Sequence, residues 1–272
     1  MEEQKQDIES NNVEKDGKIP KEKEEYPVEI KSHEQSRNSV EIEENDTSIL
    51  MSVRAGFIRK VYGILSIQLL ISFGAVMFCQ INAIKNIIFK NQVAATFLLS
   101  FSSILFTILF LSLVCCRGIS RKVPYNYLFL FGITICEAIS CSITSSMYSF
   151  QIVSTALLLT IVASLTISFY ACTTKNNFSV CRIGLYVIFS QMFAIGIIAV
   201  LFRIKILYAL YTFCMTIIIG IYLVYDTQLI MGKLGIEYSI DDYIFATLQI
   251  YMDIIRLFLL ILKILGNNSR RN

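Results

Sequence analysis

Seven runs of about 20 predominantly apolar residues follow one another from Val61 towards the end of the chain. At 1.5 Å per residue, a helix of that length crosses the ~30 Å hydrocarbon core of a bilayer. Backbone N–H and C=O groups surrounded by lipid must be hydrogen-bonded within the protein, and an α-helix pairs them within one segment. A β-barrel would need alternating polar and apolar residues, which these runs lack. We therefore predict an all-α membrane protein, a seven-transmembrane-helix bundle. The runs cover residues 61–81, 93–114, 124–147, 152–172, 183–203, 206–231 and 241–265.

Charge divides the chain into two unlike parts. Residues 1–50 contain 15 of the 21 acidic residues and 7 of the 24 basic residues, whereas residues 51–272 contain six acids and 17 bases. The first part has few large apolar residues, so it cannot bury enough surface to offset the entropy of ordering. We predict a disordered acidic cytoplasmic tail over 1–50 and a transmembrane domain over 51–272. The overall charge of +3 is the sum of these parts and indicates no nucleic-acid partner.

The basic residues in the short connections indicate an orientation. Nine of them fall in the N-terminal flank and the even-numbered connections, against six to seven on the other side. The positive-inside rule then places the N-terminus in the cytoplasm. The chain begins with charged residues instead of an apolar signal segment, which favours the same side. With seven spans the C-terminus would lie on the opposite side, and a re-entrant span would return it to the cytoplasm.

Three acidic residues fall inside the apolar runs, namely Glu137, Asp226 and Asp253. An ionised carboxylate near the bilayer centre costs about 2.5–3.5 kcal/mol, so we expect each to face the bundle interior, a wet cavity or a cation, or to be protonated. Asp226 and Asp253 lie on neighbouring helices, where two close carboxyl groups can share a proton or bind a hard cation. The pair can meet only if residues 241–246 run along the membrane interface, because the two depths along their helices differ.

The last run carries a stripe of polar residues at helical spacing, with apolar residues on its other sides. That pattern predicts a last helix in the centre of the bundle. Arg256 lies three residues after Asp253 on this stripe, where it can neutralise Asp253 or reach Asp226. Either contact would weaken cation binding. The stripe consists of Asp242, Ala246, Gln249, Asp253, Arg256, Leu260 and Lys263.

A second polar face lies on the third run, around Thr134, Glu137 and Ser140. Hydroxyl groups in membrane helices commonly hydrogen-bond to neighbouring helices, which accounts for Thr134 and Ser140 but not for a carboxylate. We therefore take Glu137 and Gln249 as candidate polar residues of an ion path. Before the last run, the spacing Ser239-x-x-Asp242 is typical of a helix-start box.

Several motifs resemble the transmembrane Bax-inhibitor-motif family in its lifeguard branch. The opening helix resembles that family at Phe57-Ile58-Arg59-Lys60-Val61-Tyr62-Gly63-Ile64-Leu65 and Gln68-Leu69-Leu70. The closing stretch is more specific, with Tyr225-Asp226-Thr227-Gln228-Leu229-Ile230-Met231-Gly232, Asp242-Tyr243 and Tyr251-Met252-Asp253-Ile254-Ile255. Between them, Pro124-Tyr125-Asn126 and Ser145-Ser146-Met147-Tyr148 are also similar. The similarity spans about residues 51–266.

The resemblance implies a function and roles for four residues. It implies a calcium leak that restrains apoptosis in the endoplasmic reticulum or Golgi, with no enzyme activity and no cofactor, calcium being the transported ion. Asp226 and Asp253 match the family's pH-sensing and gating pair, where calcium would bind only transiently. Arg121 is the candidate for an arginine that latches the closed state, and Arg256 is a further candidate modulator. The expected partners are the lipid bilayer and death-receptor or Bcl-2-type regulators.

Three departures from the family pattern bear on that function. Arg256 stands where members often carry Asn or an uncharged residue, and its positive charge argues against conductance. The family's Ser-Pro-Glu-Asp-Tyr start is Ser239-Ile240-Asp241-Asp242-Tyr243 here, and the acid expected in the fourth loop is Asn177. A non-conducting interaction protein that modulates cell-death signalling is therefore the alternative function.

An intramembrane aspartyl protease is a more distant alternative. Such enzymes also place Tyr-Asp on the sixth helix and a second Asp on the seventh, using the carboxyl groups as acid and base. Tyr225-Asp226 fits that pattern, but Asp253 follows Ile250-Tyr251-Met252 where those enzymes have Gly-x-Gly. Their later proline is also missing, since no proline follows Pro124.

Overall fold

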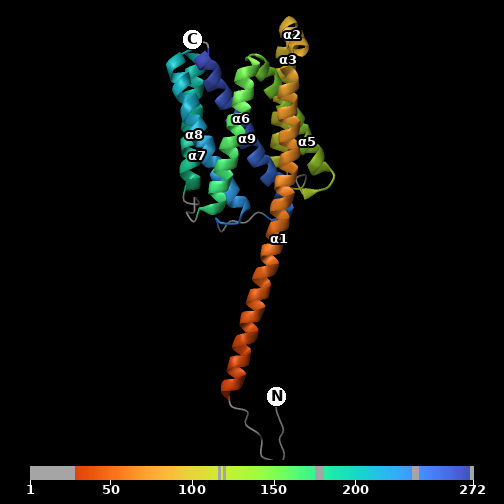
Figure 1. Ribbon diagram of the computed structural model, residues 1–272, viewed down its shortest axis with the longest axis vertical. Helices are drawn as coiled ribbons and strands as arrows, with labels where there is room; N and C mark the ends of the chain where they lie inside the picture. The colour runs from red at the N-terminus through yellow and green to blue at the C-terminus, as the bar shows by residue number, and fades with distance from the viewer. Residues whose placement is uncertain (1–27, 116–117, 119–120, 175–180, 235–238, 270–272) are drawn as a thin grey trace, which may run out of the picture. The chain divides into compact units, whose positions relative to one another are not determined.

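The computed structural model describes residues 28–115, 118, 121–174, 181–234 and 239–269, and all the regular structure within these ranges is helical (Figure 1). By compactness the chain divides into two units, Met1–Ile49 and Leu50–Asn272. The helices are α1 (Val28–Cys79), α2 (Asn82–Lys90), α3 (Gln92–Cys115), α5 (Tyr125–Ser146), α6 (Phe150–Thr173), α7 (Cys181–Leu201), α8 (Lys205–Ile230), the short 3₁₀ helix η2 (Ile240–Asp242) and α9 (Tyr243–Ser269).

The structure does not confirm a disordered tail over the whole of residues 1–50. α1 begins at Val28, directly after Pro27, and is helical through the remaining residues of the tail. This stretch contains no further proline, and its five Glu residues lose little rotamer freedom in a helix, so charge does not prevent helix formation there. Residues 1–27 lie outside the described part of the chain.

Six of the described helical segments are long and apolar enough to cross a bilayer. They are Met51–Cys79 of α1, the whole of α3, α5, α6 and α8, and Tyr243–Asn267 of α9. The remaining predicted run, 183–203, corresponds to α7, of which the shorter segment Tyr186–Leu201 is apolar. These segments support the predicted multi-pass membrane protein, but the predicted count of seven full-length spans is not confirmed among the described residues. Large apolar side chains cover much of the exposed surface, as lipid contact requires.

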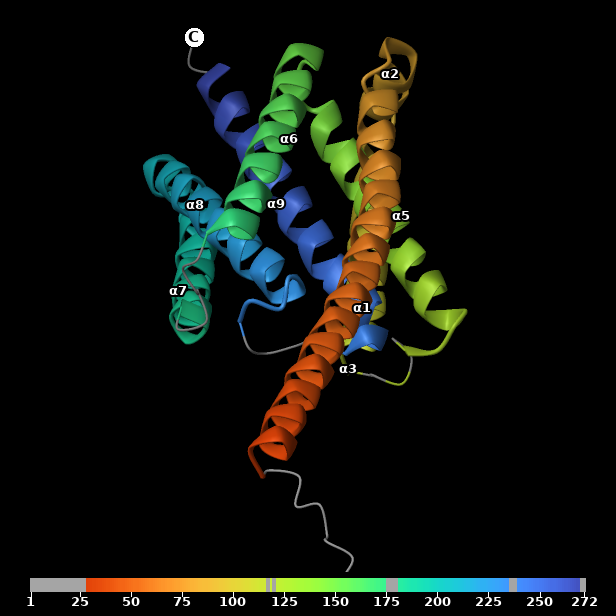
Figure 2. The same cartoon turned by 60° about the horizontal axis from the view of Figure 1, so that its bottom comes forward.

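α9 is the central helix of the Leu50–Asn272 unit, as predicted (Figures 1 and 2). In its most apolar window 72% of the residues are buried, against 11% to 44% in the other five spans. It packs against α5, α6 and α8. It also contacts α1, through a hydrogen bond of 2.8 Å between the Ser72 and Tyr251 hydroxyl groups and through the rings of Phe73 and Phe258.

α2 is an element that the sequence did not lead us to expect. It occupies the connection between the first two spans, where only the basic residues Lys85 and Lys90 had drawn attention. Ile84, Ile87 and Ile88 recur at intervals of three and four, which gives this short helix one apolar face.

Candidate functional site: a buried aspartate pair

Asp226 and Asp253 are both buried in the core of the bundle. Their exposed fractions are 6% and 5%, so both acids are shielded, as the cost of a charge in lipid requires. Asp226 lies four residues before the end of α8, in a stretch from Leu223 to Ile230 that is entirely buried. Asp253 lies ten residues after the start of α9, and α8 and α9 pack directly against each other.

The structure brings the two carboxyl groups together. The side chain of Asp226 lies within hydrogen-bonding range of the Asp253 carboxyl group. The Oδ2 atom of Asp253 is buried and has no hydrogen-bond partner among the described residues. An ionised carboxylate only accepts hydrogen bonds, so a hydrogen bond between these two groups requires a proton on one of them. The arrangement can therefore hold one proton between two acids inside the membrane.

Arg256 lies one turn beyond Asp253 on α9, yet its side chain is exposed. It interacts electrostatically with Asp253, with Glu137 on α5 and with Tyr222 on α8. Among the described residues it forms no ion pair within 4.0 Å. Arg256 thus shares the stripe with Asp253 in sequence but is not buried with it. A guanidinium is costly to desolvate, and α9 is not covered at this position.

The two candidate ion-path residues, Glu137 and Gln249, are each half-buried. Glu137 is the acid of α5 that interacts with Arg256. The hydroxyl groups beside it are used for helix packing, as expected. Gln68 Nε2 on α1 donates to Thr134 Oγ1 at 2.7 Å, and the hydroxyl groups of Ser102 on α3 and Ser140 on α5 lie 3.0 Å apart.

Arg121 lies away from the aspartate pair and binds Asp242 instead. Its Nε donates to Asp242 Oδ1 at 2.9 Å and its Nη2 to Oδ2 at 3.1 Å, a two-point contact that joins the segment before α5 to the start of α9. These hydrogen bonds raise the pKa of the Arg121 guanidinium, which stays charged. The predicted helix-start box is wrong, because the Ser239 hydroxyl makes no capping hydrogen bond.

Arg54 is a structural residue of the site that sequence reasoning missed. It had counted only as one of the basic residues before the first span. Its Nε donates to the carbonyl oxygen of Ile230 at 2.9 Å and its Nη2 to that of Leu229 at 3.0 Å. Arg54 thereby pairs the Ile230 carbonyl at the end of α8 and adds a second hydrogen bond to the Leu229 carbonyl, one turn beyond Asp226.

The turn after α8 explains why Arg54 can reach these carbonyl groups. Gly232 has a φ of +75°, and its N–H bonds Leu229 while that of Lys233 bonds Gln228. This is the Schellman pattern of a helix end, in which glycine takes the left-handed conformation. A Cβ at Gly232 would lie 2.8 Å from Arg54 Nη2, so the missing side chain also leaves room for the guanidinium. The sequence did contain a sign of this turn, because Gly232 directly follows the predicted run 206–231.

The sequence that forms this site is similar to that of a known protein family. The family described as "Inhibitor of apoptosis-promoting Bax1" matches residues 54–270, a range that begins at Arg54 and contains both aspartates. The chain belongs to this family. The resemblance inferred from the opening and closing motifs is thereby confirmed.

Individual relatives support the lifeguard branch. The chain is 33% identical to human "Protein lifeguard 3" over 223 residues, covering 80% of this chain and 70% of the relative. It is 31% identical to the mouse protein of the same name, covering 80% of this chain and 71% of the relative. It is 26% identical over 226 residues to the "Golgi anti-apoptotic protein" of vaccinia virus (strain Lister), covering 82% of this chain and 90% of the relative.

Proposed function

We propose that this protein is a pH-sensitive calcium leak channel of intracellular membranes that restrains apoptosis, and that Asp226 and Asp253 gate it. The observation that carries the proposal is the contact between two buried acids on the central helix pair, α8 and α9. Membrane-buried acids commonly mark ion paths, and two carboxyl groups in contact form a unit that titrates as a pair.

The gate follows from the proton that the pair holds. With that proton in place, a hydrogen bond joins α8 to α9 and the path between them is closed. Loss of the proton leaves two negative charges, which at ~4 Å and an effective dielectric constant of about 20 repel each other by about 4 kcal/mol. Separation of α8 from α9, or entry of a divalent cation between the carboxylates, relieves this repulsion. The leak should therefore increase as the pH rises through the titration of the pair.

Two further titratable or charged groups are recorded as interacting with the pair, Tyr222 on α8 and Arg256 on α9. Glu137 on α5 interacts in turn with Arg256, and these groups contribute to the charge that a passing cation would meet. Arg256 is the only cation among them. We infer that it lowers the affinity for calcium, as an internal brake, because its charge competes with the ion for the same carboxylates.

The cellular part of the proposal rests on the relatives. The viral relative is named a Golgi anti-apoptotic protein, and the family is described by inhibition of apoptosis. We place this chain in the Golgi or endoplasmic reticulum, with the N-terminus in the cytoplasm. Bcl-2-type or death-receptor regulators are the proposed protein partners.

Arg256 also favours a second candidate, a non-conducting interaction protein. A guanidinium within electrostatic reach of the acids supplies a permanent counter-charge, so the pair can be a packing element that needs no mobile cation. In that case replacing Asp226 or Asp253 should change the stability of the protein or its binding to partners, and no ion flux should be measurable in any variant.

Calcium efflux from proteoliposomes containing the purified chain separates the two candidates. The wild type is compared with Asp226→Asn, Asp253→Asn and Arg256→Asn over about pH 5.5 to 8, a range that the titration of such a pair can reach. Asp241→Asn is the matched control, since it removes an exposed acid that lies before the last membrane-spanning segment, Tyr243–Asn267. Folding of each variant is checked by its elution as a single species in detergent.

The channel predicts an efflux that rises with pH, loses its pH dependence in both gate variants, and increases in Arg256→Asn. Asp241→Asn should follow the wild type. Efflux no greater than that of empty liposomes at every pH, from folded protein, would reject the channel in favour of the interaction protein.

A further inference from the structure

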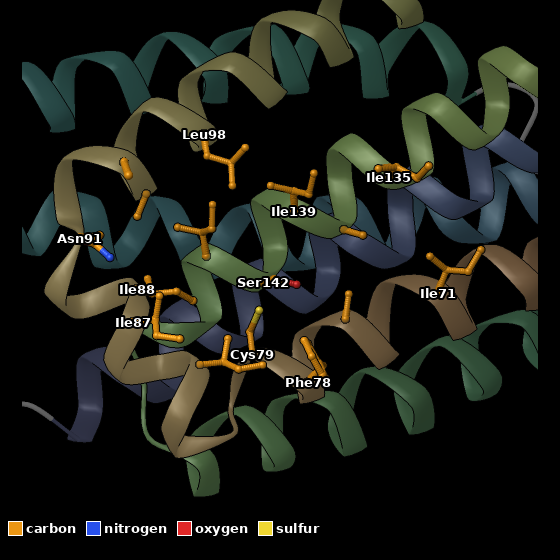
Figure 3. Close-up of a pocket in the computed structure, with 16 residues that line it drawn as sticks. Ile71, Phe78, Cys79, Ile87, Ile88, Asn91, Leu98, Ile135, Ile139 and Ser142 are labelled. Carbon is orange, nitrogen blue, oxygen red and sulfur yellow. The ribbon is translucent and has the colours of Figure 1, made fainter.

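Two cavities of the helical bundle differ in the chemistry that they offer to a ligand. An apolar groove of about 550 Å³ lies between α1, α2, α3 and α5, where α2 closes it against α5 (Figure 3). Its lining contains no charged side chain, so it favours no particular occupant. A smaller cavity of about 230 Å³ lies between the first turns of α8 and the last turns of α9, and Lys263 is part of its lining. The smaller cavity is therefore the one whose chemistry can select a ligand.

Lys263 is a cation inside a membrane-spanning segment. The span of α9 ends at Asn267, so Lys263 lies four residues, or about 6 Å, before that end. Its side chain is half-buried and has no hydrogen-bond or ion-pair partner among the described residues. A charge in a membrane segment is costly unless it is paired or reaches the interface, and the flexible stem of a lysine can extend that far. Lys263 is thus available to pair with an anion at the membrane surface.

Two further polar side chains line the outer end of the cavity. Asn267 is the last residue of the α9 span, and Tyr208 lies three residues, or about 4.5 Å, after the start of α8. An amide and a phenol can both donate hydrogen bonds to the oxygens of an anion. Further in, the Thr212 hydroxyl is already used, since it donates to the carbonyl oxygen of Tyr208 at 2.8 Å. Phe213, about 12 Å from the start of α8, can contact only an apolar group.

An exposed apolar stripe continues from the cavity towards the bilayer centre along α8. It consists of Ile206, Leu210, Phe213 and Ile217, which follow one another at steps of four, three and four residues and therefore share one helix face. Each of these side chains is more than half exposed. Phe213 belongs both to the stripe and to the lining of the cavity. An acyl chain that is joined to a headgroup in the cavity can therefore follow α8 into the hydrocarbon core.

The side of the membrane on which α9 ends is basic and contains no acid among the described residues. Because successive spans alternate in direction, residues 80–91, 147–149 and 202–204 connect helices on this side. These segments and residues 254–269 contain no Asp or Glu, whereas α2 and the start of α8 add lysines. The choline of a zwitterionic headgroup would bring a second cation to this region. A headgroup with a net negative charge would supply the charge that is missing.

We propose that this cavity binds the headgroup phosphate of an anionic glycerophospholipid. Lys263 pairs with the phosphate, Asn267 and Tyr208 donate hydrogen bonds to its oxygens, and one acyl chain lies along the stripe on α8. The cavity is smaller than the about 300–1,000 Å³ of a complete small-molecule site, which suits a headgroup whose chains stay in the bilayer. A phosphate ion free in solution would leave the exposed stripe without a role.

The test is native mass spectrometry of the full-length protein with equal amounts of phosphatidylserine and phosphatidylcholine in detergent micelles. We expect phosphatidylserine to be retained about tenfold more, and Lys263→Gln to weaken its binding about tenfold, as the loss of one charge-assisted hydrogen bond implies. Lys90→Gln is the matched control, because it removes an exposed lysine on the same side of the membrane that does not line the cavity, and it should change binding less than about twofold.

A second pair of variants keeps the charge and changes only the space. Ala209→Leu narrows the cavity from α8 and should also weaken phosphatidylserine binding about tenfold. Ala194→Leu makes the same change on the exposed face of α7 and should leave binding unchanged. Each variant is required to elute as a single species in detergent before its lipid binding is compared.

Three results would overturn the proposal. Equal retention of the two lipids by the wild type would reject a preference for an anionic headgroup. Equal losses in Lys263→Gln and Lys90→Gln would trace the binding to the net charge of this side of the membrane. Displacement of phosphatidylserine by inorganic phosphate alone would assign the cavity to a free anion. The lipid site does not depend on ion conduction, so its outcome is separate from that of the efflux experiment.

Discussion

Removing the Arg54 side chain should loosen the end of α8 that carries Asp226. The guanidinium makes two charge-assisted hydrogen bonds, of 2.9 and 3.0 Å, to carbonyl groups at that helix end. Each such bond contributes about 1.5–3 kcal/mol when fully buried. Arg54 is only partly buried, so we discount this sum and expect Arg54→Ala to cost about 1–3 kcal/mol in total.

Two variants isolate this effect from the loss of a positive charge. Arg59→Ala removes the same charge five residues later on α1, where the side chain is exposed, and should cost less than about 0.5 kcal/mol. Arg54→Lys keeps the charge but replaces a planar two-point donor by an ammonium group, so it should recover only part of the loss. The assay is the midpoint of SDS-induced unfolding in mixed micelles.

Amide hydrogen exchange locates the change. In Arg54→Ala, exchange should increase in the last turn of α8 and in the turn after it, and should stay at the wild-type rate in the middle of α3. Equal destabilisation by Arg54→Ala and Arg59→Ala would refute the assigned role, since it would trace the effect to charge alone. An increase in exchange spread over all helices would refute it as well.

Three further changes test other contacts of the bundle. Gly232→Ala forces a side chain into a φ of +75°, so it should lower the free energy of unfolding by about 1–2 kcal/mol in the same micelle assay. Tyr251→Phe removes a buried hydroxyl that lies 2.8 Å from that of Ser72, and should lower the free energy of unfolding by about 1–2 kcal/mol. The Ser72→Ala/Tyr251→Phe double variant should lose less than the sum of the two single losses, because both remove the same hydrogen bond. Arg121→Asp and Asp242→Arg should each lower the melting temperature at low salt, and the double exchange should restore part of it; no recovery would contradict the two-point contact.

The membrane helices could be predicted from the sequence with good accuracy. The expected runs 93–114 and 152–172 became α3 (Gln92–Cys115) and α6 (Phe150–Thr173), within two residues at each end. The reason is that lipid leaves a backbone few alternatives to a helix, so the length of an apolar run nearly fixes the element. In water this constraint is absent. The helical stretch from Val28 to residue 50 was accordingly missed, because its charge pattern describes solubility and not backbone structure.

The candidate site was only partly predictable. The cost of an ionised group in lipid identified Asp226 and Asp253 as shielded acids, and both are buried. Helical spacing placed Arg256 on the same face as Asp253, yet its side chain is exposed, and nothing in the sequence indicated that Arg54 binds the end of α8. Helical spacing shows which residues share one face of one helix. It carries no information on how far that face is covered by neighbouring helices.

The amino-acid sequence by itself determined that this chain crosses a membrane, where its helices lie, and which acids had to be protected from lipid. These properties follow from the composition of single segments and the cost of charge in hydrocarbon. Only the tertiary structure decided that Asp226 meets Asp253, that Arg121 binds Asp242, and that α2 closes a groove against α5. The rotation and depth of each helix are set by the packing of side chains from several helices at once, and no single segment contains that information.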